Sequence, residues 1–117
     1  MIIIEESYSL KHYNTFGLSV CARIFAEVTQ YEELKHVINI FRDDPRSKMI
    51  LGGGSNILFT KDYDGVVIFP DLKGCDLIKE TSEYVWVKAF AGENWDSFVN
   101  ICVSNNWGGV ENLSLHF

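Results

Sequence analysis

The feature that most constrains this chain is a glycine-rich stretch set between two short apolar runs. In order it reads Met49-Ile50-Leu51-Gly52-Gly53-Gly54-Ser55-Asn56-Ile57-Leu58-Phe59. Glycine tolerates backbone with positive φ and lets a ligand approach the main chain closely. Consecutive N–H groups in such a loop can converge on an anion. The stretch therefore indicates a main-chain cradle for a phosphate or diphosphate, with Ser55 and Asn56 as side-chain donors.

The loop fits neither of two better-defined phosphate motifs. No Gly-Lys-Ser/Thr follows it, as a P-loop requires. Ile57 occupies the third position of the dinucleotide fingerprint, and no long amphipathic helix begins there. From the loop alone, a tight strand-to-strand turn without a ligand stays open as an alternative.

Composition favours one folded, acidic domain or a piece of one. The chain has 117 residues, is 47% hydrophobic and carries a net charge of −6. An acidic chain without a basic stripe argues against nucleic acid and against an anionic membrane as partners. No apolar run approaches the ~20 residues of a membrane span. Glu5 and Glu6 follow the first apolar residues at once, unlike a signal peptide, and we expect a cytoplasmic protein.

Cysteine and histidine spacing points to no metal or nucleophile site. The three cysteines are Cys21, Cys75 and Cys102, and the three histidines are His12, His36 and His116. Neither set matches a metal-ligand spacing or a CxxC motif. We therefore expect free thiols and no metal site, and the positions of the histidines suggest no Ser/His/Asp grouping.

The first half of the chain predicts a βαβ unit. Residues 21–28 make a plausible strand, and Thr29 with Glu32 forms a capping box at the start of a helix. The apolar helix face that follows consists of Leu34, Val37, Ile38 and Phe41. A strand at 49–51 then precedes the glycines, and we expect it to run parallel to the strand at 21–28. Ligands of proteins with α/β sheets bind at the C-terminal ends of the strands, which is where the glycines stand.

The second half predicts a short buried strand at 66–69, an antiparallel hairpin and a second helix. Residues 75–80 and 84–90 form the hairpin, and residues 94–105 the helix. Both faces of the strand at 84–90 carry apolar side chains, which is typical of a central strand. We assign Trp95 and Phe98 to the core. The whole is expected to be one α+β unit with a small mixed sheet and two helices.

The first residues predict an extended arm that ends in a turn. Residues 1–18 form this arm, and residues 19–117 form the remaining domain. Asn14 and Thr15 stand in the turn, where such side chains usually bond to nearby backbone, and chemistry alone does not make them ligands.

Five segments in a fixed order carry a resemblance to a known family. They are His12-Tyr13-Asn14-Thr15-Phe16-Gly17, the stretch Ile50 to Phe59, Gly65-Val66-Val67-Ile68, Ala91-Gly92-Glu93-Asn94-Trp95 and Gly109-Val110-Glu111-Asn112-Leu113. Together they closely resemble the N-terminal part of the UDP-N-acetylenolpyruvoylglucosamine reductase family, also called UDP-N-acetylmuramate dehydrogenase. The resemblance covers nearly all of this chain but about the first third of the family's usual length.

The resemblance implies a flavoenzyme of peptidoglycan synthesis with an FAD-binding domain of the vanillyl-alcohol-oxidase (PCMH) type. In the family NADPH reduces FAD, and the reduced flavin reduces the enolpyruvyl group of a UDP-sugar. Gly52, Gly53, Gly54, Ser55 and Asn56 would hold the FAD diphosphate. Ala91 and Gly92 would form a second backbone approach to the flavin.

The end of the chain departs from the family pattern. His116 and Phe117 stand where the family continues into an Ile-Pro-Gly segment, and the family's catalytic residues lie beyond it. We therefore expect a truncated subdomain that is inactive as a reductase by itself and that self-associates through surfaces left exposed. Two other interpretations are a non-catalytic nucleotide-binding or interaction module, and another oxidase with the same FAD fold.

Overall fold

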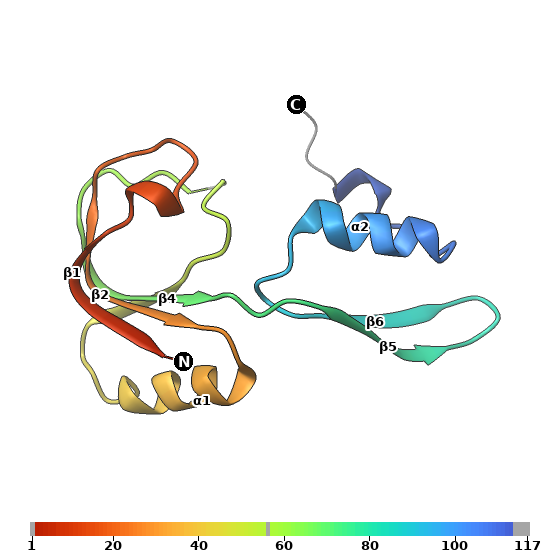
Figure 1. Ribbon diagram of the computed structural model, residues 1–117, viewed down its shortest axis with the longest axis horizontal. Helices are drawn as coiled ribbons and strands as arrows, with labels where there is room; N and C mark the ends of the chain where they lie inside the picture. Colours follow the sequence, from red (N-terminus) through yellow and green to blue (C-terminus); the bar gives the residue numbers. More distant parts are fainter. Residues whose placement is uncertain (1, 56, 114–117) are drawn as a thin grey trace. The chain divides into compact units, whose positions relative to one another are not determined.

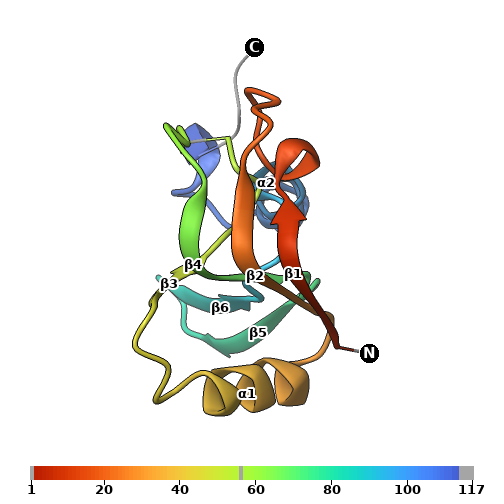
Figure 2. The ribbon, with the colours of Figure 1, turned by 90° about the vertical axis from the view of Figure 1, so that its left-hand side faces the viewer.

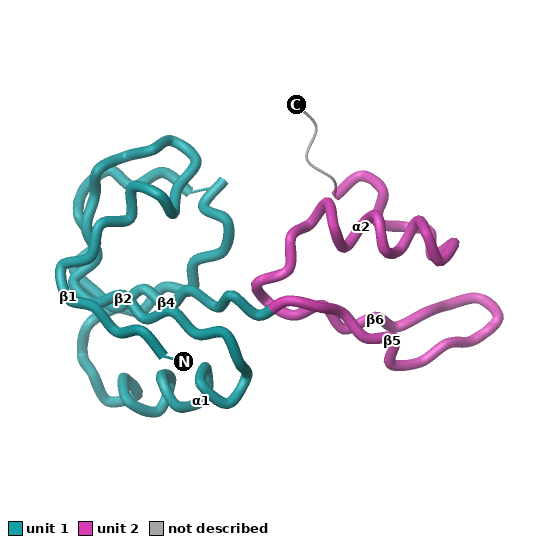
Figure 3. Tube along the Cα trace, viewed as in Figure 1, with its two compact units in different colours: residues 1–72 teal, residues 73–117 magenta. Residues whose placement is uncertain are grey.

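The computed structural model describes residues 2–55 and 57–113, and it separates into two compact units. Unit 1 comprises residues 1–72 and unit 2 residues 73–117 (Figure 3). The sequence predicted one α+β unit with a small mixed sheet, whereas the described strands form two sheets, one in each unit. The strands of unit 2 pair with each other in a separate two-stranded sheet. The expected mixed sheet and the two expected helices are confirmed.

Unit 1 is built on a four-stranded mixed sheet in the order β1-β2-β4-β3. Its strands are β1 Ile3–Ser9, β2 Cys21–Val28, β3 Ser47–Ile50 and β4 Tyr63–Pro70. β1 runs antiparallel to β2, whereas β2 and β3 both run parallel to β4. The predicted parallel relation of β2 and β3 is confirmed, but β4 lies between them. β4 takes a central place because its apolar residues are continuous, with Val66, Val67 and Ile68 all buried.

Helix α1, Tyr31–Ile40, begins one residue later than the predicted capping box implies. Gln30 is the N-cap, and the Glu33 carboxylate accepts hydrogen bonds from the backbone N–H groups of Thr29 at 2.9 Å and Gln30 at 3.1 Å. Glu33 thus accepts from the N-cap and from the residue before it, so the box is formed by Gln30 and Glu33 instead of Thr29 and Glu32.

The two faces of the sheet in unit 1 are covered by different layers. α1 covers one face (Figures 1 and 2), where Val37 and Phe41 pack on Ile24, Ala26, Val28, Val66 and Ile68. Ile38, which we expected on the same helix face, is 45% exposed. The opposite face is covered by the loops at 10–20 and 51–62, whose buried members with β2 and β4 are Leu10, Val20, Ala22, Phe25, Leu51, Phe59 and Val67. The glycine-rich stretch therefore belongs to a loop layer packed on the sheet.

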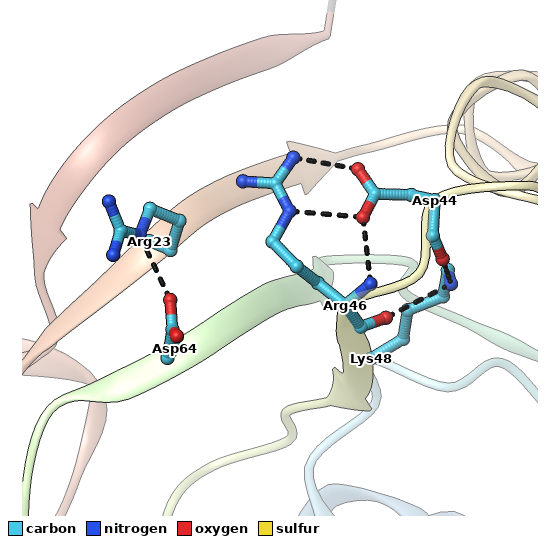
Figure 4. A network of polar contacts seen from close by, with 5 residues as sticks. All are labelled: Arg23, Asp44, Arg46, Lys48 and Asp64. Carbon is cyan, nitrogen blue, oxygen red and sulfur yellow. Dashed lines mark hydrogen bonds and ion pairs between the residues drawn. The ribbon is translucent and has the colours of Figure 1, made fainter.

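A polar network fixes the connection between α1 and β3 (Figure 4). The Asp44 carboxylate accepts from Arg46 Nε at 3.0 Å, from Arg46 Nη2 at 2.7 Å and from the Arg46 backbone N–H at 2.9 Å. Lys48 Nζ donates to the Asp44 carbonyl oxygen at 2.7 Å. Arg23 on β2 pairs with Asp64 on β4 at 3.0 Å, but both side chains are more than half exposed, so this pair adds little stability.

Unit 2 contains the predicted hairpin and helix. β5, Cys75–Glu80, pairs antiparallel with β6, Val85–Ala89, and α2 spans Trp95–Ser104, followed by a 3-10 turn at Glu111–Leu113. The Asn94 side chain caps α2 by accepting from the N–H groups of Asp96 at 2.8 Å and Ser97 at 3.1 Å. The expectation that the strand at 84–90 is central is wrong, because β6 has one partner strand among the described residues and Tyr84 and Trp86 are exposed.

The core assignment of two aromatic residues of α2 also needs correction. Trp95 is 55% exposed, so its assignment to the core is wrong, and Phe98 is half-buried. The buried residues of α2 are Val99 and Cys102. The helix periodicity placed Val99 and Cys102 on the buried face correctly, whereas Trp95 and Val103 at the edges of that face are exposed.

Candidate functional site

The glycine-rich loop begins directly after β3, as predicted. The Leu51 N–H donates to the Ile68 carbonyl at 2.9 Å and continues the parallel pairing with β4 for one residue. Leu51 is 3% exposed and anchors the start of the loop in the core, whereas Gly52 and Gly53 are exposed. The loop therefore leaves the sheet at a fixed point and presents its next two peptide groups to solvent.

The main-chain donors of this loop have no partner within the described residues. No described group accepts a hydrogen bond from the N–H of Gly52, Gly53, Gly54 or Ser55. A Cβ built on Gly52 or Gly53 would meet no atom within 4 Å, and neither residue has a positive φ. Neither packing nor backbone conformation of the described chain thus requires glycine there. An anion held close to the backbone would explain why these two positions are glycine.

Gly54 is glycine for a different reason. It is buried, its φ is +71°, and a Cβ built on it would overlap the Tyr13 carbonyl oxygen and lie 2.8 Å from Asn14 Cα. The Gly54 carbonyl accepts from the Thr15 N–H at 3.1 Å. Two segments far apart in the sequence are thus in backbone contact at this point.

The segment that touches Gly54 is itself held in place by a buried asparagine. Asn14 is 8% exposed and bonds to the backbone of Leu10 and Leu18. The expectation that Asn14 bonds to nearby backbone is confirmed, but the contact with Gly54 was not foreseen. No sequence signal connects the two positions, because the contact depends on how two loops pack on one sheet face.

Tyr13 belongs to an aromatic cluster beneath this contact. Its ring lies 4.9 Å from that of Phe25 and 5.1 Å from that of Phe69, centroid to centroid. The Tyr13 and Tyr8 hydroxyls are 3.4 Å apart. This hydrogen bond, together with burial, raises the pKa of Tyr13 to about 12, so the phenol is neutral at physiological pH.

The other predicted site residues, Ala91 and Gly92, lie in unit 2 at the turn between β6 and α2. The Gly92 carbonyl accepts from Lys73 Nζ at 2.6 Å, and Ala91 is exposed. Ala91 lines a pocket of about 220 Å³ together with Ala89, Phe90, Glu93, Trp95 and Phe98. Hydrogen bonds from the backbone of Gly74 and then Asn94 lower the pKa of Glu93, which keeps a negative charge beside this mostly apolar pocket.

The predicted site therefore divides between the two units. Gly52, Gly53, Gly54 and Ser55 lie in unit 1, and Ala91 and Gly92 in unit 2. Asn56 lies outside the described residues. Within the described part of the chain no group of three or more His, Cys, Asp or Glu residues is placed to hold a metal ion, and the three cysteines are free. No helix formed by the described residues has the length and apolarity needed to cross a membrane.

Comparison with known proteins identifies the family. The sequence matches the FAD binding domain family over residues 22–117. This chain belongs to the FAD binding domain family. The match includes the glycine-rich loop as well as Ala91 and Gly92, and an FAD-binding domain needs groups that hold a diphosphate. The unpaired amides described above fit that requirement.

Relatives of this FAD-binding domain include enzymes named UDP-N-acetylenolpyruvoylglucosamine reductase. The protein of that name from Flavobacterium johnsoniae is 49% identical over 112 residues, which cover 96% of this chain and 33% of the relative. Those from Bacteroides fragilis and Pseudomonas aeruginosa are 43% and 36% identical over the same proportions. The chain thus spans about a third of the length of the curated relatives it matches.

Proposed function

We propose that this chain is the FAD-binding portion of a flavoenzyme that uses NADPH to reduce UDP-N-acetylglucosamine enolpyruvate to UDP-N-acetylmuramate in peptidoglycan synthesis. The observation that carries the proposal is the set of unpaired backbone N–H groups at Gly52 to Ser55, in a chain that belongs to the FAD binding domain family. The names of its relatives support the reductase activity. Such a reductase acts in the cytoplasm.

In this proposal the glycine-rich loop holds the FAD diphosphate. Exposed amides at Gly52 and Gly53 donate to phosphate oxygens, and the exposed hydroxyl of Ser55 adds a side-chain donor. Asn56 is proposed as a second side-chain donor. Backbone N–H groups suit this task because they carry no side chain that blocks the approach of the ligand. Charged acceptors also form stronger hydrogen bonds than neutral ones.

Ala91 and Gly92 are proposed to contact the flavin at a less charged part. Glu93 stays ionised beside them, and a carboxylate repels a diphosphate. The pocket that Ala91 lines also includes Phe90 and Phe98, whose apolar side chains suit the face of an aromatic ring system. Backbone at Ala91 and Gly92 therefore fits the ring system better than it fits the phosphates.

The chemistry of the proposed reaction belongs to the cofactor. FAD supplies hydride transfer, whereas the protein binds, orients and shields it. We assign no catalytic residue to this chain, and the UDP-sugar and NADPH are proposed as ligands of the longer protein. We expect the chain alone to be inactive, so flavin-dependent NADPH oxidation by the purified chain in the presence of the UDP-sugar would contradict that expectation.

Titration of the purified chain with FAD tests the proposed cradle. We expect saturable binding with quenching of flavin fluorescence and about tenfold weaker affinity in Gly52→Ala, because a Cβ would stand where a phosphate oxygen approaches. Stability should not change, since this Cβ meets no protein atom within 4 Å. Ser82→Ala, at an exposed turn residue of unit 2, serves as the matched control and should bind FAD normally.

Two results would contradict the cradle. If the unaltered chain takes up no FAD, the alternative of a non-catalytic nucleotide-binding or interaction module is favoured. If FAD binds but Gly52→Ala binds it equally well, the diphosphate is held elsewhere.

A further inference from the structure

The loop at residues 10–18, which we call the brace loop, is closed by one buried side chain. All the hydrogen bonds of the Asn14 side chain are made with the backbone of this loop. Its Nδ2 donates to the carbonyls of Leu10 at 2.8 Å and Leu18 at 3.2 Å, and its Oδ1 accepts from the Leu18 N–H at 3.0 Å. Removing this side chain would leave the Leu18 N–H without its partner and would break the link between Leu10 and Leu18, although the two carbonyls would keep the hydrogen bonds they accept from Tyr13 and Val20. Asn14 therefore connects the two ends of the brace loop.

The brace loop is attached to the core at its base. Leu10 is fully buried, and its N–H donates to the Val20 carbonyl at 2.8 Å. The ring of Tyr13 packs against Phe25 and Phe69 on the sheet. The base of the brace loop is therefore held by buried contacts with the sheet of unit 1.

The tip of the brace loop supports the glycine-rich loop. The Thr15 N–H donates to the Gly54 carbonyl, and the Tyr13 carbonyl and Asn14 Cα lie so close to Gly54 that no Cβ fits between them. Within the described residues this is the one backbone hydrogen bond that reaches residues 52–55. The position of the proposed donors thus depends on this contact with another segment as well as on the anchor at Leu51.

We infer that Asn14 is a positioning residue for the proposed diphosphate cradle, acting through the brace loop and the Thr15–Gly54 hydrogen bond. The inference rests on the proposed function of the glycine-rich loop. Loops that are ordered before binding cost less entropy when the ligand arrives. When a ligand binds only one conformation of a protein, its apparent affinity is proportional to the fraction of the protein in that conformation. Asn14 keeps that fraction high.

The test compares Asn14→Ala with Val37→Ala. Val37 is fully buried in α1 on the opposite face of the sheet, so its replacement weakens unit 1 without touching the brace loop. We expect FAD affinity, measured well below the melting temperature, to fall about tenfold in Asn14→Ala and to stay unchanged in Val37→Ala. The tenfold loss corresponds to a fall in the population of the binding-competent conformation to about a tenth. Equal effects of the two substitutions would overturn the inference.

A second measurement needs no FAD. NMR relaxation of the ligand-free chain gives order parameters for the amides of Gly52, Gly53 and Ser55. We expect values near ~0.85 in the unaltered chain and Val37→Ala, and below ~0.6 in Asn14→Ala. Low values already in the unaltered chain, or no change in Asn14→Ala, would overturn the inference. If the unaltered chain binds no FAD, the proposed function fails and these order parameters alone decide the role of Asn14.

Thr15→Pro gives a second route if Asn14→Ala does not fold. It removes the N–H that bonds to Gly54 and leaves the three Asn14 hydrogen bonds in place. The backbone of Asn14, with φ −139° and ψ 145°, already has the extended conformation that precedes proline. We expect the same loss of FAD affinity and of order at residues 52–55, and normal values in this variant would overturn the inference.

Discussion

Gly54→Ala should be far more damaging than the same change at Gly52, two residues earlier. Gly54 has φ +71°, where alanine costs about 1–2 kcal/mol. The new Cβ would also overlap the Tyr13 carbonyl oxygen and lie 2.8 Å from Asn14 Cα. Both are backbone atoms that cannot move aside as a flexible side chain does, and such overpacking costs about 1–3 kcal/mol. Together we expect a loss of about 2–5 kcal/mol, a large part of the ~5–15 kcal/mol typical of a domain.

Amide hydrogen exchange in β2 and β4, followed as a function of denaturant, measures the free energy of unfolding of unit 1. Tryptophan emission provides an internal control, because Trp86, Trp95 and Trp107 all lie in unit 2. Gly52→Ala should stay within about 0.5 kcal/mol of the unaltered chain. The reasoning is refuted if Gly54→Ala is tolerated as well as Gly52→Ala, or if the loss is seen equally by tryptophan emission.

Three further predictions concern pH and assembly. The pKa of Tyr13 is raised to about 12 by its hydrogen bond with Tyr8, so the free energy of unfolding of unit 1 should fall as pH rises from about 10 to about 12. Tyr13→Phe should abolish this pH dependence, which denaturation measured at a series of pH values would detect. The pKa of Glu93 is lowered by hydrogen bonds from the backbone of Gly74 and Asn94, so Glu93 should stabilise unit 2 above its ordinary pKa and lose this effect in acid. Glu93→Gln should reduce the acid dependence of tryptophan emission, with a remainder due to Glu111, whose pKa is also lowered. The β5–β6 hairpin carries exposed apolar residues, and among the described residues its strands pair only with each other, which predicts self-association. A single monomeric species in sedimentation velocity at high concentration would contradict this.

Local patterns located most of the secondary structure. The strand at Cys21–Val28, the hairpin and the helix at Trp95–Ser104 follow from periodicity and turn residues. The patterns were less accurate where several residues offer the same chemistry. Thr29 and Gln30 can both precede a helix, and Glu32 and Glu33 can both reach back, so the exact cap depended on where the chain leaves β2.

The sequence by itself determined that the glycine-rich stretch follows a parallel strand and presents unblocked backbone, because glycine and the flanking apolar runs act locally. It also determined the family, through the order of motifs along the chain. Only the tertiary structure decided why the glycines differ: Gly52 and Gly53 face open space, whereas Gly54 packs against the backbone of Tyr13 and Asn14. That distinction arises between segments remote in the chain, and the packing of two loops on one face of a sheet has no local signature in either of them.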